Sequence, residues 1–173
     1  MQEITSRISD PIVPNVGLGG FRLRTPLEDL HTFLMHIYIE RKGDSSWCSA
    51  ESIFDIAYDL DPILLVVNAQ NGKVGSVIAR LGYLGTLFGR ISVGMLIGDA
   101  MAIDDRLYYD EALEKVFVRD CPGVALWHPD NDPPPELVPS LSIMAIEVFV
   151  PEEFIGGGFT GSRALYEGSD RDG

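Results

Sequence analysis

Two stretches of this 173-residue chain, 70 residues apart, have the same order of apolar and polar positions. GGFRLRTPLEDLHTFL covers residues 19–34 and GRISVGMLIGDAMAID covers residues 89–104, and the two align without a gap. Segments rich in β-forming residues follow both stretches. Internal duplication of this kind indicates that one unit does not bury its apolar face alone. We therefore expect two copies of one unit, with a coincidence of amphipathic patterns as the alternative.

The first stretch predicts a short strand followed by a helix. Phe21 and Leu23 alternate with two arginines, which is typical of a strand with one apolar face. Thr25 then fits a helix cap, Pro26 the first helical position, and Glu28 the end of a capping box. The apolar stripe expected along this helix consists of Leu27, Leu30, Phe33, Leu34 and Ile37.

Three antiparallel strands are expected after this helix. Residues 54–58 and 74–79 alternate between two faces, and residues 63–67 form a continuous run of β-forming side chains. Asn71-Gly72 lies between the last two of these segments. This dipeptide predicts a two-residue hairpin in which both residues have positive φ.

The second unit has a weaker helix and several strands. Met95 stands where a serine or threonine cap would be expected, and Gly98 costs about 1 kcal/mol inside a helix relative to alanine. Packing must therefore hold this helix. The strands expected after it cover residues 107–110, 115–120, 124–128 and 142–149.

The fold class expected from these patterns is α+β. It consists of two tandem strand-helix-antiparallel meander repeats, about 17–86 and 87–152, with the helices packed on one face of an antiparallel sheet. Residues 1–16 are expected to form an N-terminal extension, residues 17–152 a single domain, and residues 153–173 a flexible C-terminal tail.

The segment HPDNDPPPELVP, residues 128–139, interrupts two apolar runs with five prolines and three acids. Proline does not donate to a strand ladder, so the segment could protect a sheet edge. Alternatively, Pro133, Pro134 and Pro135 could stiffen an extended loop, so that ordering it on a partner costs less. Both interpretations stay open at this stage.

The chain has a formal net charge of −13 and a pI near 4.4. Such a surface repels phosphate backbones and steers cationic proteins toward itself, although acidity can also serve solubility alone. We therefore expect no nucleic-acid partner. Cys48 and Cys121 are too few for a disulfide scaffold, and we expect them to be reduced and partly buried. No apolar run has the length of a signal peptide core or a membrane span, so we expect a cytoplasmic protein and no membrane partner.

No motif in the sequence names a reaction. His31 and His36 lie five residues apart, about 140° around a helix, so they cannot chelate one ion together. The chain has no HExxH, CxxC or GxSxG motif, and its glycine-rich segments lack the setting of a nucleotide-binding loop. Asp104-Asp105, or Asp130 with Asp132, could bind a divalent ion, but the neighbouring prolines argue against a chelating loop. We expect no enzyme activity, no metal and no cofactor.

The segments around Tyr108-Tyr109 and Trp127-His128 combine aromatic side chains with acids, and this combination indicates a protein-binding surface. Tyrosine and tryptophan provide large rigid contact areas, and they occur here among acids. Strand alternation requires that only one of Tyr108 and Tyr109 point inward. The predicted partner-binding residues are Asp105, Tyr108, Tyr109, Asp110, Glu111, Glu114, Trp127, His128, Asp130, Asp132 and Glu136.

Segments from about residue 16 to residue 150 are similar to small bacterial immunity proteins. The resemblance lies in GLGGFRLRTPLEDL, VVNAQNGKVGSVIARLGYLGTLFGRISVGMLIGDAM, LYYDEALEKVF, PGVALW and DPPPELVPSLSIMAIEVF. Such proteins are encoded beside polymorphic toxins, including Rhs-type effectors of type VI secretion. The resemblance implies a stoichiometric inhibitor that covers a cognate toxin with a cationic active-site cleft. The expected architecture also resembles the repeats of β-lactamase inhibitor protein and of outer-membrane assembly lipoproteins, whose lipid-attachment signal this sequence lacks.

Two other classes of function remain open. The chain could be a small enzyme or ligand-binding protein that uses His128, Asp130 or Tyr109 inside a concave sheet. It could also be an assembly adaptor that pairs a strand with a partner through an open sheet edge. A deep pocket lined by those three residues would favour the enzyme or ligand-binding protein, and an apolar unprotected edge would favour the adaptor.

Overall fold

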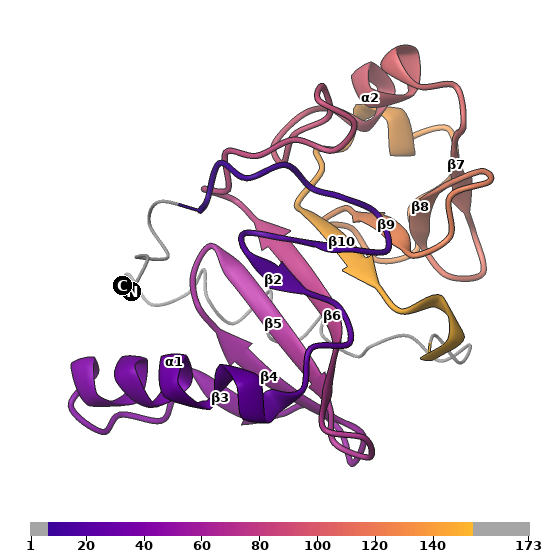
Figure 1. The fold of residues 1–173 in the computed structure, drawn as a ribbon. Helices are drawn as coiled ribbons and strands as arrows, with labels where there is room; N and C mark the ends of the chain where they lie inside the picture. Colours follow the sequence, from indigo (N-terminus) through magenta and orange to yellow (C-terminus); the bar gives the residue numbers. More distant parts are fainter. Residues whose placement is uncertain (1–6, 154–173) are drawn as a thin grey trace.

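The computed structural model describes residues 7–153 as an α+β fold with one large antiparallel sheet (Figure 1). Eight strands form this sheet in the order β3-β4-β5-β6-β10-β9-β8-β7, and a separate pair, β1-β2, lies near the N-terminus. The expected α+β class is confirmed. The expected C-terminal tail lies outside the described residues, except for residue 153.

The elements follow the chain as one helix and four strands, and then again as one helix and four strands. The first set comes after β1 (Gly17–Leu18) and β2 (Phe21–Arg22), and comprises α1 (Leu27–Glu40), β3 (Cys48–Ala50), β4 (Asp55–Asp59), β5 (Ile63–Asn68) and β6 (Lys73–Arg80). The second set comprises α2 (Ile97–Ile103), β7 (Leu107–Asp110), β8 (Lys115–Val118), β9 (Val124–Trp127) and β10 (Ala145–Phe149). Two short 3-10 helices, η2 (Val138–Ser140) and η3 (Pro151–Glu153), precede and follow β10.

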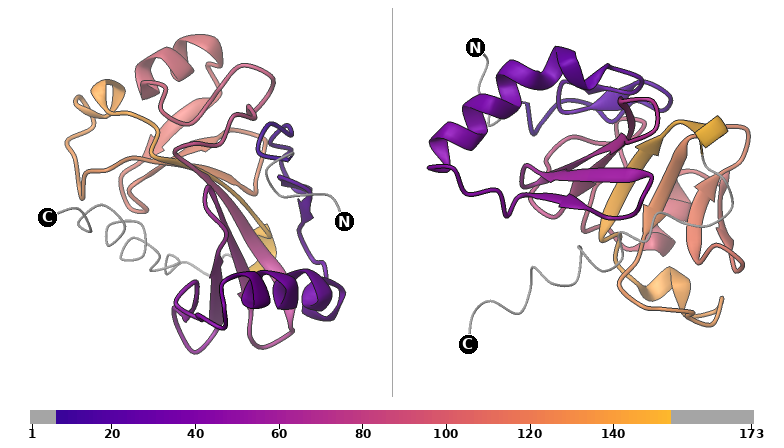
Figure 2. Two further views of the ribbon diagram at one scale, coloured as in Figure 1. Left: turned by 90° about the vertical axis from the view of Figure 1, so that its left-hand side faces the viewer. Right: turned by 90° about the horizontal axis from the view of Figure 1, so that it is seen from below.

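The last strands of the two sets meet in the middle of the sheet. β6 pairs with β10 in antiparallel register from Ser76 opposite Phe149 to Arg80 opposite Ala145. The outermost strands of the sheet are consequently β3 and β7, the first strand of each set. The two helices lie at opposite ends of the molecule (Figures 1 and 2).

One face of the sheet carries the main hydrophobic core, to which both helices contribute. Leu34 and Ile37 of α1 and Ile97 and Ala100 of α2 are buried in the same cluster. The whole stripe predicted for α1 packs there, because its helical spacing places those side chains on one side. The core also includes Ile8 and Ile12, which precede the expected domain boundary at residue 17.

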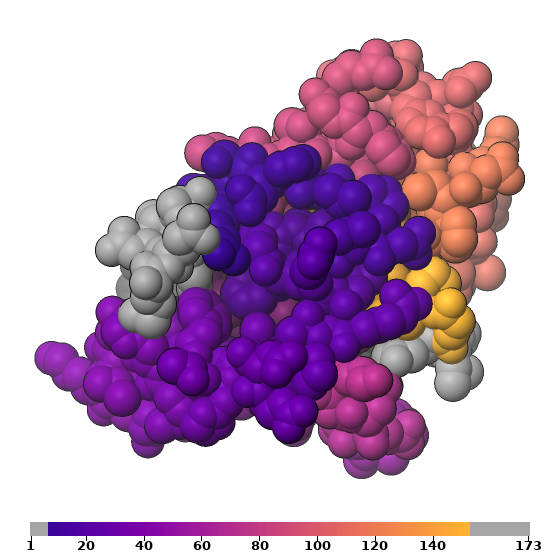
Figure 3. Space-filling model, viewed as in Figure 1, coloured from indigo at the N-terminus to yellow at the C-terminus, as the bar shows by residue number. Residues whose placement is uncertain are grey.

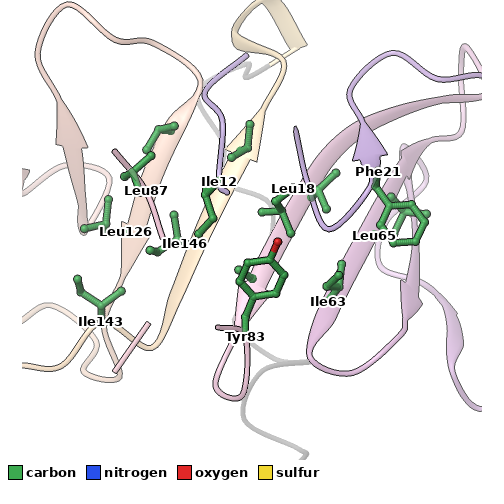
Figure 4. Packing of buried hydrophobic residues seen from close by; sticks show 14 of the residues in the cluster. Ile12, Leu18, Phe21, Ile63, Leu65, Tyr83, Leu87, Leu126, Ile143 and Ile146 are labelled. Atoms are coloured by element: carbon green, nitrogen blue, oxygen red, sulfur yellow. The ribbon is translucent and has the colours of Figure 1, made fainter. Parts of the chain in front are cut away.

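The N-terminal part of the chain covers the centre of this face (Figure 3). Figure 4 shows Ile12, Leu18 and Phe21 packed against residues of the sheet and of the segment that follows β6. Tyr83 lies in this layer and donates a hydrogen bond from its hydroxyl to the carbonyl of Asp10 at 2.8 Å. Burial is the main cause that raises the pKa of Tyr83 to about 12.

The start of α1 differs from the predicted capping box. The helix begins at Leu27, Pro26 occupies the cap position, and no side chain caps the first turn. Leu27 instead donates its backbone N–H to the carbonyl of Gly72 at 2.8 Å. The β5–β6 hairpin therefore supplies an acceptor for the first amide of the helix, in place of a side-chain cap.

The start of α2 has the same backbone contacts 70 residues further along. In the first set, the amides of Arg24, Leu27 and Val74 donate to Val74, Gly72 and Thr25. In the second set, the amides of Gly94, Ile97 and Ile143 donate to Ile143, Leu141 and Met95. Arg24 and Gly94 also both have positive φ, 65° and 88°.

Gly98 has a packing reason inside α2. A Cβ atom at this position would lie 2.9 Å from the carbonyl oxygen of Pro139 and 3.2 Å from its Cβ. The glycine thus lets η2 approach the helix closely, and Val138 of η2 is buried in the core. Tertiary contact offsets the weak helix propensity that the sequence indicates.

The hairpin at Asn71-Gly72 is present, but its predicted geometry is wrong. Asn68 pairs with Lys73, which leaves four residues in the loop instead of two. Only Gly72 of the dipeptide has positive φ, at 66°. The side chain of Asn71 accepts a hydrogen bond from the backbone N–H of Lys73 at 2.9 Å, which stabilises this longer turn.

The proline-rich segment does not protect a sheet edge. It connects β9 to β10, and both are interior strands. The segment crosses from the end of β9 to η2, which packs against α2. Pro133 is buried, whereas the two prolines after it are exposed. The interpretation that the prolines protect an edge strand is therefore wrong, because neither of the strands that the segment joins lies at an edge of the sheet.

The opposite face of the sheet carries a second cluster made entirely of strand residues. Its buried members are Ala57, Leu64, Val66, Ile78, Ala125, Trp127, Ala145 and Phe149, with Phe117 partly buried against them. Glu147 lies among them on β10 and is 2% exposed. Both faces of this sheet are thus apolar near its centre.

Candidate functional site

The predicted partner-binding residues gather at the β7 end of the sheet. Strand alternation sends Tyr108 and Tyr109 of β7 to opposite faces. The Tyr108 ring lies 6.2 Å from Phe117, and the Tyr109 ring lies 5.7 Å from His128. Tyr109 packs against the main core, whereas Tyr108 belongs to neither core cluster, so only one of the two tyrosines points inward, as alternation predicted.

A groove of about 560 Å³ lies on the Tyr108 side of this end. It runs between β7, β8, the turn that follows β8 and the end of β10. Its aromatic and charged lining consists of Tyr108, Phe117, Phe149, Asp110, Arg119 and Asp120. The predicted residues Tyr108 and Asp110 are therefore part of a concave surface.

The other predicted residues of this end meet on the Tyr109 side. Glu114, in the β7–β8 turn, accepts a hydrogen bond from the backbone N–H of Asp132 at 3.1 Å. Both residues have positive φ, 51° and 47°. The structure thus brings together the β7–β8 turn and the proline-rich segment, the two segments that the sequence indicated separately. Burial and then nearby acids, Glu114 first, raise the pKa of Tyr109.

His128 is buried beneath this contact and is 6% exposed. Neither ring nitrogen forms a hydrogen bond of normal geometry among the described residues. Burial lowers the pKa of His128, and backbone groups and charges of Asp130 and Glu114 oppose that shift. A neutral imidazole is consequently favoured at this position.

Trp127 is also buried, on the opposite face from His128. Its indole Nε1 donates to Glu147 at 2.9 Å, and the ammonium of Lys115 lies 3.8 Å from the centre of its ring. Ser76 donates a second hydrogen bond to Glu147 at 2.8 Å, and Lys115 lies 3.6 Å from the same carboxylate. Trp127 and His128 are therefore part of the protein interior, and neither belongs to the proposed contact surface.

The exposed charge at this end is strongly negative. Residues 104–136 contain nine acids and three bases. Lys115 is buried, and Arg106 forms a two-point ion pair with Asp104 at 2.9 and 2.6 Å. Arg119 is exposed and lies over the Tyr108 ring at 5.6 Å. The exposed acids are Asp105, Glu111, Glu114, Asp120, Asp130, Asp132 and Glu136.

Several residues of this end were missed by the sequence analysis. Phe117, Arg119 and Asp120 line the groove, although only the neighbouring strand was singled out. Alternation along β8 could have indicated that Phe117 shares a face with Tyr108. The lone acid in the apolar run SIMAIEVF was a signal for Glu147. Cys121 also lines the groove and is half-buried, whereas Cys48 is exposed, so the expected burial of Cys48 is wrong.

The described residues 7–153 contain no group of three or more metal-ligating side chains that could hold an ion. Among the same residues, no helix is both long and apolar enough to cross a bilayer. Comparison of the chain with protein-family models, with curated proteins and with solved structures found no match.

Proposed function

We propose that this chain is an immunity protein that neutralises a cognate bacterial toxin by binding its catalytic domain in a stoichiometric complex. The observation that best supports this proposal is the β7 end of the sheet, where exposed acids surround a groove lined by aromatic side chains. Arg106 and Lys115 are paired with Asp104 and Glu147, so the exposed acids of this end outnumber its remaining base, Arg119, and can attract a cationic partner. Such a surface accelerates encounter with an oppositely charged protein.

The proposed partner is a toxin with a cationic cleft, of the kind that acts on nucleic acid or nucleotides. Acids at the β7 end would then occupy the part of the toxin cleft that binds the phosphate groups of its substrate. The resemblance to immunity proteins of Rhs-type and type VI effectors supports this proposal, as does the net charge of −13. A cytoplasmic location follows from the same proposal, because an immunity protein must meet a toxin where the toxin acts.

We also propose that the chain arose by duplication of one helix and meander unit. Three observations support this origin: the repeated order of elements, the start of both helices at positions 70 residues apart, and the matching backbone contacts before α1 and α2. The two units would then pair through β6 and β10, much as two subunits pair across a symmetric interface. Divergence between them leaves the acidic groove on the second unit.

The alternative function as an enzyme or ligand-binding protein required a pocket lined by His128, Asp130 and Tyr109. The groove is lined by other residues, and Tyr109 and His128 lie on the opposite side of the sheet. No observation therefore favours that alternative over a binding surface.

The test begins with the gene that neighbours this one. The toxin domain encoded there is expressed with and without the full chain, and cell survival, complex stoichiometry and toxin activity are measured. We expect rescue, a 1:1 complex and loss of toxin activity. Absence of rescue, or rescue without a complex, would contradict the proposal.

A charge-neutralised variant tests the surface. Asp105→Asn, Glu111→Gln, Asp130→Asn and Glu136→Gln are combined, and all four side chains are exposed. We expect the association rate with the toxin to fall by about tenfold or more at low salt. Glu28→Gln with Asp29→Asn on α1 is the control, because it removes exposed acids at the other end of the molecule. Equal losses in both variants would place the interface elsewhere.

A further inference from the structure

The groove beside β7 combines two features that cations favour. Tyr108 and Phe117 form a pair of tilted rings with centroids 6.2 Å apart, and the faces of such rings attract ammonium and guanidinium groups. Asp110 and Asp120 provide carboxylates in the same lining. The groove therefore suits a side chain that has an apolar stem and a positive end.

Neither groove carboxylate forms an ion pair with a described residue. Oδ1 of Asp110 accepts hydrogen bonds from the backbone N–H groups of Ala112 and Leu113 at 3.0 and 3.1 Å. Among residues 7–153, Asp110 and Asp120 form no ion pair. A positive group entering the groove would consequently gain both attractions without displacing an internal ion pair.

Arg119 shows how a guanidinium fits this surface. Its Cζ lies 5.6 Å from the centre of the Tyr108 ring, at the lining of the groove. The side chain is exposed and makes no ion pair among the described residues, so it can move into solvent. A guanidinium from another protein can then take its place over Tyr108.

We propose that the groove receives an arginine side chain from an extended basic segment of the partner protein. Arginine fits better than lysine, because its planar end stacks on aromatic rings and donates several hydrogen bonds. This inference rests on the proposed function and adds the chemistry of the partner: a basic segment whose arginine lies between Tyr108, Phe117 and the two carboxylates.

The experiment uses nuclear magnetic resonance on the full chain labelled with ¹⁵N. The probe is the peptide acetyl-Gly-Arg-Gly-amide, and the matched control is the same peptide with neutral citrulline. We expect the arginine peptide to shift the amide signals of Phe117, Arg119 and Gly123 with saturation. Citrulline should bind at least about fivefold more weakly, because it keeps the shape but loses the charge. Equal binding of the two peptides would overturn the proposal.

Variants of the full chain separate the groove from general acidity. Asp110→Asn and Asp120→Asn should each weaken arginine peptide binding about two- to fivefold, as expected for one exposed ion pair. Asparagine keeps Oδ1 of residue 110 as an acceptor, so the β7–β8 turn is preserved. Asp105→Asn and Glu136→Gln make the same charge change outside the groove and should leave binding within about twofold. An equal loss of arginine peptide binding in all four variants would contradict the proposal that the groove is the binding site.

A third variant should change the affinity for the arginine peptide in the opposite direction. Arg119→Gln should tighten arginine peptide binding, because it removes a competing guanidinium and a like charge; weaker binding would contradict the proposal. The rescue assay keeps the two proposals apart. Rescue of toxin-bearing cells without peptide binding removes the arginine site alone, whereas peptide binding without rescue removes the immunity function.

Discussion

The carboxylate of Glu147 accepts a hydrogen bond from the indole of Trp127, 2.9 Å away, inside a mainly apolar layer. Glu147 belongs to β10 and Trp127 to β9, while Ser76, the other hydrogen-bond donor, belongs to β6. One buried carboxylate thus links three neighbouring strands at the centre of the sheet. The Lys115 ammonium on β8, 3.6 Å away, supplies the opposite charge.

Removal of this carboxylate should be strongly destabilising. Glu147→Ala leaves the buried Lys115 without its carboxylate, and such a change typically costs about 3–5 kcal/mol of unfolding free energy. Urea denaturation followed by Trp fluorescence measures the loss. The double variant Glu147→Met with Lys115→Met should lose less, because no buried charge is left behind. A single variant within about 1 kcal/mol of the parent would show that the pair contributes little.

Gly98 should not tolerate a methyl group, although alanine is the better helix former. Gly98→Ala places a Cβ 2.9 Å from the carbonyl oxygen of Pro139, so η2 must move away from α2. We expect a loss of about 1–3 kcal/mol in the free energy of unfolding. Ala102→Ser, at an exposed position of the same helix, is the control and should change stability by less than about 0.5 kcal/mol. A more stable Gly98→Ala variant would mean that the α2–η2 contact is looser than described.

The buried stripe of α1 can be compared with its exposed side on a single helix. Ile37 is 7% exposed and Ile39 is 67% exposed. Ile37→Ala should cost about 2–5 kcal/mol, because it removes core contacts and leaves a cavity. Ile39→Ala should cost less than about 0.5 kcal/mol. Thermal and urea unfolding of both variants provide the comparison, and similar losses at the two positions would contradict the placement of α1.

His128 should make stability depend on pH in a defined direction. Burial lowers its pKa in the folded chain, while the unfolded chain has an ordinary pKa of about 6.5. Between these two values the unfolded state binds more protons, so stability falls as the pH falls. The stabilisation is full above about pH 6.5 and is lost as the pH drops through the folded pKa. Tyr109, Glu114 and Asp130 are the titratable residues near the ring.

Unfolding free energies measured from pH 7.5 to pH 5 test this dependence. His128→Leu should reduce the slope, because the proton that the unfolded chain binds preferentially at this position is then absent. His31→Gln, at an exposed position of α1, should keep the slope of the parent chain. An unaltered slope in His128→Leu would assign the pH dependence to the carboxylates instead.

Local patterns predicted the elements of this fold well. The α1 stripe, the hairpin near Asn71 and the strands β7 to β10 all depend on spacing within short segments, and spacing decides which face a side chain takes. The start of α1 was misplaced because its first amide bonds to Gly72, which lies 45 residues away from Leu27. The residues next to Leu27 do not indicate such a long-range contact, so it cannot be predicted from the local sequence.

The candidate site was predicted in part. The β7–β8 turn and the proline-rich segment were both singled out by their acids, and Glu114 does meet Asp132. The interior position of β9 could not be foreseen, because strand order depends on pairing across the whole chain. The same non-local pairing buries Trp127 and His128 and adds Phe117 and Phe149 to the groove.

The central place of β10 also affects how this sheet can be made. β10 is the last of the described strands in sequence, yet it joins β6 to β9. During synthesis, the four strands β3 to β6 and the three strands β7 to β9 each keep an open edge until residues 145–149 leave the ribosome. Open edges are templates for pairing with other chains, so nascent or truncated forms of this protein are the ones most exposed to aggregation. Folding of the complete sheet is therefore coupled to the synthesis of β10 rather than to the completion of the first four strands.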